Sequence, residues 1–177
     1  MGNYQFSGAY IAESPQWVTP QSAVDSNLNL DTAGDRVIVN PNGVPGTGSD
    51  VKALTNTAGQ VVAYQAKNPE AQFIRAQAGA LATSGRNILP TNPINNFDVN
   101  VTKSFTARER YRFEIRADFF NALNHPQYTP GRLDNVTSAS HINETSYLTP
   151  GNPLFAKWDQ VFPSNSRVIQ LAAKFLF

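Results

Sequence analysis

The last twelve residues, 166–177, constrain the fold of this chain more than any other stretch. Every second position is apolar: Ile169, Leu171, Ala173, Phe175 and Phe177. The positions between them include Gln170 and Lys174. A period of two is typical of a β-strand with one apolar face and one wetter face. A strand whose last side chain is aromatic is also typical of a transmembrane β-barrel, where such side chains lie at the membrane interface.

Three further segments show the same alternation, at residues 3–13, 96–105 and 110–120. In 96–105 the apolar face is interrupted only by Lys103. In 110–120 the apolar side chains alternate with Arg112, Glu114, Arg116 and Asp118. Neighbouring charges of opposite sign can pair along and across strands. We therefore expect these four residues to face a barrel lumen, either pairing with one another or lining a substrate path.

The connections between these segments alternate in length. Residues 14–95 and 121–165 are long and rich in proline and glycine, whereas 106–110 is short. Outer-membrane barrels combine short periplasmic turns with long external loops. The sequence therefore predicts an all-β fold: an antiparallel transmembrane β-barrel segment, about four strands of a larger barrel, with two extracellular loops. Within the first loop we expect a hairpin around Ala58-Gly59 and a short helix near 69–84.

Composition agrees with this fold and excludes several functions. Charged residues make up 15% of the chain, well below the usual level of about 25% for soluble domains. The chain has no cysteine, so thiol chemistry and disulfides are excluded. Its two histidines do not predict a zinc site, and its net charge of +1 predicts no nucleic-acid partner. No motif places a nucleophile beside a base, so we do not expect an enzyme.

Oxygen-bearing side chains recur at Asp25, Asn27, Asn29, Asp31 and Asp35. Calcium takes six to eight oxygen ligands from loops of this kind. The pattern is not that of an EF-hand, because Leu30 and Arg36 occupy the glycine and glutamate positions. The alternative interpretation is a solvated turn held by Asn and Asp side chains. The sequence indicates no cofactor other than calcium.

Two other interpretations of the whole chain remain open. A soluble sheet that buries one face also alternates, so the chain could be a soluble all-β carbohydrate-binding module. Trp17 and Trp158 would then stack on a sugar. The third interpretation is an outer-membrane adhesion or surface protein without transport.

Several short stretches resemble the end of Oar-like TonB-dependent receptors. They are Gly85-Arg86-Asn87, Asn95-Asn96-Phe97-Asp98, the run from Arg116 to Pro126, and the closing run from Arg167 to Phe177. The resemblance is weaker in Asp25-Ser26-Asn27-Leu28-Asn29, Gly34-Asp35-Arg36 and Asn40-Pro41. It implies a 22-stranded barrel with an amino-terminal plug, located in the cell outer membrane. It also implies that the closing strand, with Ile169, Leu171, Phe175 and Phe177, is part of the barrel-assembly signal.

The resemblance further implies a set of partners: outer-membrane lipid, the barrel-assembly machinery, the rest of the barrel with its plug, and TonB. This chain departs from the family in having no plug and no TonB-contact segment. About four strands cannot close a barrel, since known ones begin at eight. The start of the chain lacks a basic segment followed by an apolar core. We therefore expect a piece whose natural beginning lies upstream.

Overall fold

A computed structural model describes residues 3–31, 35–108, 110–130 and 146–177. It divides the chain into two compact units. The sheet unit contains Met1–Ser14, Pro93–Thr129 and Ser164–Phe177, and the loop unit contains Pro15–Asn92 and Pro130–Pro163.

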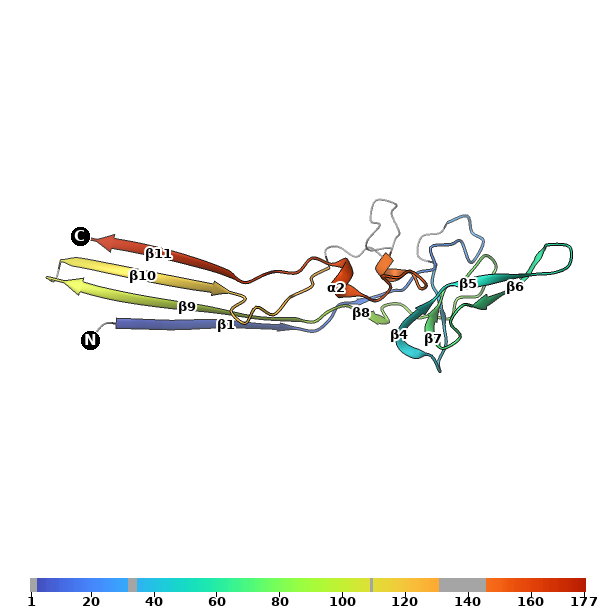
Figure 1. Cartoon of the computed structure of the whole chain (residues 1–177), viewed down its shortest axis with the longest axis horizontal. Coiled ribbons are helices and arrows are strands. Elements are labelled where there is room, and N and C mark those ends of the chain that lie inside the picture. The colour runs from blue at the N-terminus through green and yellow to red at the C-terminus, as the bar shows by residue number, and fades with distance from the viewer. Residues whose placement is uncertain (1–2, 32–34, 109, 131–145) are drawn as a thin grey trace. The chain divides into compact units, whose positions relative to one another are not determined.

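The sheet unit is built on four antiparallel strands that lie side by side in the order β1-β9-β10-β11 (Figure 1). They are β1 (Asn3–Glu13), β9 (Ile94–Ala107), β10 (Tyr111–Phe120) and β11 (Val168–Leu176). Each strand lies where the alternation predicts it, with ends that differ by at most two residues. The register is continuous across the sheet: Ser7 lies opposite Asn100, Asn100 opposite Asp118, and Asp118 opposite Gln170.

The polarity of this sheet is the reverse of that in a soluble protein. Thr102, Ser104 and Asp118 on one face are buried. The other face exposes a continuous set of large apolar side chains, namely Tyr4, Phe6, Tyr10, Phe105, Tyr111, Phe113, Ile115, Ile169, Leu171 and Phe175. Such a face is unfavourable in water and suited to lipid. The antiparallel β-barrel segment predicted from the alternation is confirmed.

The hydrophobic core of the described residues lies in the loop unit. Short strands form it: β3 (Ile38–Val39), β7 (Ala71–Ile74) and β4 (Val44–Ser49) make one sheet, β2 (Trp17–Val18) pairs with β8 (Leu89–Pro90), and β5 (Val51–Thr55) pairs with β6 (Val61–Ala66). The buried apolar side chains are Val18, Val37, Ala71, Phe73, Ala76, Leu89, Tyr147, Leu148, Phe155 and Phe162. The long connections therefore form a packed unit.

Both long connections contribute to this one core. The backbone N–H of Gln21 donates to the carbonyl of Leu148 at 3.0 Å, and the Tyr147 hydroxyl donates to the Pro90 carbonyl at 2.7 Å. Burial raises the pKa of Tyr147 to about 12, so this hydroxyl stays protonated and remains a donor. Phe155 packs edge-on against Phe73, with ring centroids 5.8 Å apart. The two loops consequently stabilise each other.

The hairpin expected near Ala58-Gly59 is confirmed: β5 and β6 flank a turn in which Gly59 has a φ of +79°. The helix expected over 69–84 is wrong. Residues Ala71–Ile74 form β7 instead. This strand lies between β3 and β4 in their sheet, and its side chains Ala71 and Phe73 are buried. Tertiary packing overrides the helix propensity of the alanines here.

The helix α2 (Trp158–Val161) is a single turn in the loop unit. Among the described residues, no helix is both long enough and apolar enough to cross a membrane.

We predict that Phe73→Ala opens the loop unit while the protein still inserts in the membrane. Truncating a buried phenylalanine typically costs about 3–5 kcal/mol, and Phe73 contacts the second loop through Phe155. Limited proteolysis of intact cells should show faster cleavage within the loops. Leu81→Ala is the control, because Leu81 is 88% exposed. Equal cleavage of the two variants would contradict a shared core.

Candidate functional site on the polar face of the sheet

The candidate site is the polar face of the four-stranded sheet, where the structure brings together the four charged residues predicted to face the lumen. Arg112, Glu114, Arg116 and Asp118 share this face of β10. Arg112 lies 3.4 Å from Glu114, and the Nε of Arg116 lies 2.9 Å from the carboxylate of Asp118. Neighbouring charges of opposite sign therefore pair along the strand, and a position facing the barrel lumen stays a prediction.

Polar side chains of β9 extend this pairing across the sheet. The amide of Asn100 donates to Asp118, and Arg112 donates to the Ser104 hydroxyl at 3.2 Å. The Ser104 hydroxyl in turn donates to Glu114 at 3.4 Å. Each charge is thus compensated by a neighbour in the wall. A face of this kind can contact water, a polar solute or a polar protein surface without a large field of one sign.

An open hollow of about 220 Å³ lies on this face, where β1 carries small side chains. Its lining residues are Ser7, Gly8, Ala9, Asp98, Val99, Asn100, Arg116, Asp118, Phe119 and Phe120. Two carboxylates, an amide, a guanidinium and two aromatic rings thus lie around the three small residues of β1. The arrangement can offer hydrogen bonds and apolar contacts to a group that approaches this face.

A network of amide side chains holds the loop-side end of the sheet. The Gln127 side chain donates to the carbonyl of Asn95 and accepts its N–H at 2.6 Å, so it completes the ladder at the start of β9. The Asn121 side chain donates to the carbonyls of His125 and Asn165 at 2.9 and 3.2 Å. Asn124 accepts the N–H of Arg167 at 3.1 Å. These bonds fasten the strand ends where the chain leaves the sheet.

Sequence reasoning missed this network. The available signal was the run Asn121-Ala122-Leu123-Asn124 directly after a strand. Asn121 and Asn124 both adopt a φ of +52°, a left-handed conformation that asparagine tolerates better than most residues. Asparagine side chains also bond to nearby backbone groups in such turns. The spacing therefore indicates a cap, although the partners at residues 95 and 165 are visible only in the fold.

Aromatic side chains mark both ends of the apolar face. Tyr10 and Phe97 lie at the loop end with ring centroids 6.5 Å apart, and Phe105 and Phe113 lie at the turn end with centroids 6.3 Å apart. Phe97 and Phe105 are eight residues apart on β9. At a rise of about 3.4 Å per residue and a tilt of about 40° this separation is roughly 20 Å, close to the height of a membrane-facing band.

The Asp- and Asn-rich loop forms a turn held by its own side chains. The carboxylate of Asp25 accepts the N–H groups of Asn29 and Leu30 at 3.0 and 2.8 Å. Asp35 is buried and accepts the N–H of Ser26 at 2.6 Å. Asn27 and Asn29 cap the following N–H groups in the same manner. This is the pattern of Asx turns, and the calcium interpretation stays a prediction.

The two tryptophans belong to different elements of the loop unit. Trp17 begins β2 and is 54% exposed, whereas Trp158 begins α2 and is half-buried. A role in stacking on a ligand stays a prediction for both. His125 contacts the Gln127 amide through its Nδ1 at 2.9 Å. His141 lies outside the described residues.

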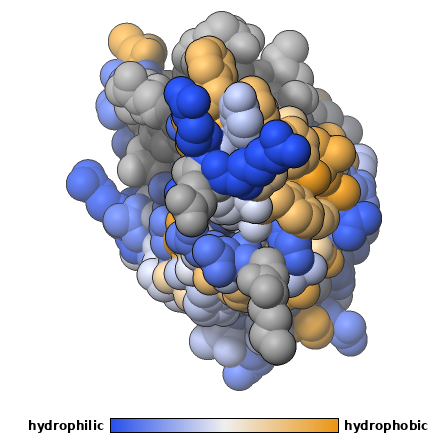
Figure 2. Space-filling view, turned by 90° about the vertical axis from the view of Figure 1, so that its left-hand side faces the viewer, coloured by the Kyte–Doolittle hydropathy of each residue, from blue (hydrophilic) through white to orange (hydrophobic). Residues whose placement is uncertain are grey.

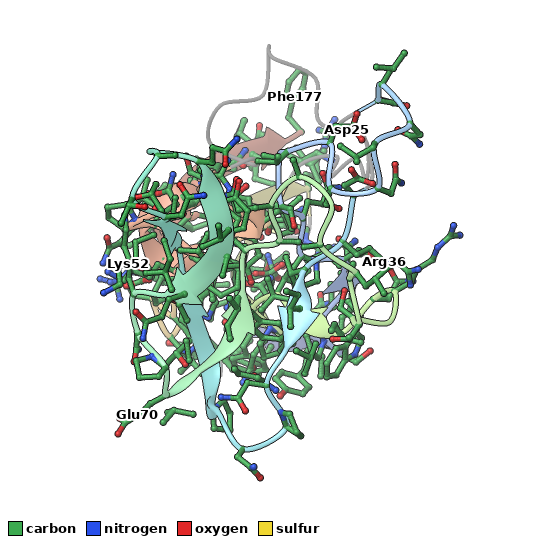
Figure 3. The ribbon with its side chains drawn as sticks, turned by 90° about the vertical axis from the view of Figure 1, so that its right-hand side faces the viewer. Asp25, Arg36, Lys52, Glu70 and Phe177 are labelled. Atoms are coloured by element: carbon green, nitrogen blue, oxygen red, sulfur yellow. The ribbon has the colours of Figure 1, made fainter. Side chains whose placement is uncertain are left out.

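Charged side chains of the loop unit are dispersed. Figure 3 shows Asp25, Lys52 and Glu70 at separate edges of this unit. Asp50 is 2.6 Å from the ammonium of Lys67, and the hydrogen bond from Lys67 holds the pKa of Asp50 below its usual value. In the described parts of the chain, no three His, Asp or Glu side chains gather in a way that could hold a metal ion.

A sheet with one polar face of paired charges, one exposed apolar face and an aromatic belt at each end is the wall of a transmembrane β-barrel. The comparison with protein families agrees: residues 1–170 match the family described as outer membrane beta barrel domain. The chain belongs to this family, and its location is the cell outer membrane. No curated protein and no solved structure matches the chain. An outer-membrane location is incompatible with the soluble carbohydrate-binding module.

We predict that Gln127→Ala weakens the sheet at its loop end. The substitution leaves the N–H and C=O of Asn95 without their partner, and an unsatisfied buried polar group costs about 1–3 kcal/mol. The folded, detergent-resistant form of the protein should convert to the unfolded form at a lower temperature on heating. Gln170→Ala removes an amide from exposed β11 and should have little effect. Equal midpoints for the two variants would contradict the role of the network.

We predict that Asp35→Ala loosens the loop around residues 25–31 even when a chelator is present. The carboxylate of Asp35 is buried and holds Ser26 and Asn27. Protease sensitivity of this loop, measured on the intact protein with calcium and with chelator, distinguishes the two interpretations. The Asx turn requires equal protection in both conditions for the unsubstituted protein. Protection that needs calcium, and that the double variant Asp25→Ala/Asp31→Ala lacks, would establish a calcium site instead.

Proposed function

We propose that this chain supplies part of the barrel wall and the external loop unit of a TonB-dependent receptor of the Oar-like type. The observation that carries the proposal is the sheet of reversed polarity with two open edges. Within the described residues, β1 pairs only with β9 and β11 only with β10. Lipid offers no hydrogen bonds to strand edges, so both edges need partner strands. The wall is therefore part of a larger barrel.

The finer assignment rests on three supports. The stretches 85–87, 95–98, 116–126 and 167–177 resemble the end of Oar-like receptors. The two long connections fold into a unit with its own core, which suits loops that admit or bind a large solute. The polar face carries compensated charges and an open hollow, as expected for a wall that contacts a plug or a hydrated solute.

In this role the chain acts by structure and performs no catalytic step. The strands complete the wall, and the polar face contacts the plug. The loop unit helps to select the solute, with Trp17 and Trp158 as candidate contacts. The barrel-assembly machinery would recognise the closing strand β11, and TonB would contact the amino-terminal part of the receptor. A calcium ion in the loop around Asp25 and Asp35 would serve only to hold that loop.

Association with TonB tests this proposal. The full-length receptor that contains this chain, extracted from the outer membrane in mild detergent, should be retained by the immobilised periplasmic domain of TonB from the same bacterium. The same detergent extract passed over bare resin is the control.

A full-length, correctly folded receptor that does not associate with TonB would contradict the proposal. The second candidate function, adhesion without transport, then follows from the exposed loop unit. Attachment of cells that carry or lack the protein would measure that function.

A further inference from the structure

The apolar face of the sheet carries one charged residue in the described strands, Lys103 on β9. Its position is fixed by the alternation that places Val99, Val101 and Phe105 on the same face. In the described part of the chain, the ion pairs do not include Lys103. This cation on the apolar face therefore has no counter-charge among the described residues.

The Lys103 ammonium is held against aromatic rings. It lies 3.4 Å from the centroid of the Tyr4 ring and 5.2 Å from that of Phe105. Tyr4 is directly opposite Lys103 in the register of β1 and β9. Both rings belong to the aromatic belt at the turn end of the sheet. The long side chain thus places its charge at the level of the membrane interface, where cationic side chains reach polar groups.

Two further cations lie at the same end. Arg108 and Arg110 are exposed in the short turn between β9 and β10, and Glu109 between them lies outside the described residues. Figure 2 looks at this end of the molecule and shows hydrophobic side chains gathered beside strongly hydrophilic ones. A cation framed by aromatic rings, with two arginines in the turn at the same end of the sheet, matches a lipid headgroup whose phosphate is anionic and whose acyl chains continue along the apolar face.

We infer that Lys103, Tyr4 and Phe105 form a binding site for the headgroup of an anionic glycerophospholipid. The short turn defines the leaflet, because short turns of outer-membrane barrels face the periplasm. The lipid is therefore one of the periplasmic leaflet. Lys103 pairs with the phosphate, the rings of Tyr4 and Phe105 hold the ammonium in place, and Arg108 and Arg110 add attraction from the turn. The inference requires a barrel in the outer membrane and does not require TonB.

Lipid retention by the intact protein tests the site. The protein is reconstituted into phosphatidylcholine bilayers that contain a minor fraction of phosphatidylglycerol, extracted in mild detergent, and its retained lipid is identified by native mass spectrometry. We expect enrichment of phosphatidylglycerol. Lys103→Gln should lower that enrichment about fivefold, the usual effect of one cation near an anionic membrane surface. Lys103→Arg should keep most of it, because the charge and the aromatic contacts remain.

Lys52→Gln is the matched control, because it removes the same charge from the exposed strand β5 of the loop unit. It should retain phosphatidylglycerol as the unsubstituted protein does. Equal enrichment in Lys103→Gln and Lys52→Gln would overturn the proposal. If Lys103→Gln does not insert in the membrane, the site is tested on the unsubstituted protein alone. Its enrichment of phosphatidylglycerol must then fall as the salt concentration rises, because salt screens the charge of the headgroup. Enrichment that is absent or independent of salt would overturn the site.

Discussion

The structure depends on one constraint, the need to bond every backbone polar group of a sheet that lies in lipid. Helices and closed barrels are the arrangements that meet it. The four strands satisfy each other through a ladder without interruption from β1 to β11. The reversed polarity follows from the same setting, because lipid covers the apolar face and charge pairing such as Arg116–Asp118 stabilises the other face. The outer edges of β1 and β11 then determine that the wall continues.

The loop unit buries its large apolar side chains, whereas the sheet exposes them. It buries Phe73, Tyr147 and Phe155 in a core as a soluble domain does. One chain is thus suited to lipid in its sheet and to water in its loop unit. The amide network of Asn121 and Gln127 lies where the strands of the sheet end. Side-chain amides suit this place because they replace the backbone ladder as it stops. The function proposed for the chain uses both parts, a rigid wall and a selective unit outside it.

The sheet could be predicted almost completely, whereas the loop unit could not. The strand positions could be predicted because the alternation of apolar and polar residues reflects the environment of each side chain on its strand. The shared face of the charges Arg112, Glu114, Arg116 and Asp118 followed from the same pattern. The core of the loop unit depends on contacts such as that of Gly48 with Phe155, whose positions along the chain carry no periodic signal. The incorrect helix at 69–84 arose there, because local propensity was the only guide.

The alternation along the strands was enough to define the class of the protein: an antiparallel β-barrel wall with one face for lipid and one for polar contacts. It did so because lipid and water sort side chains residue by residue along each strand. Only the tertiary structure decided that the two long loops share a core, that amides fasten the strand ends, and that Lys103 reaches the ring of Tyr4. These features join residues far apart in the chain, and their energy comes from contacts that exist only after the strands have paired.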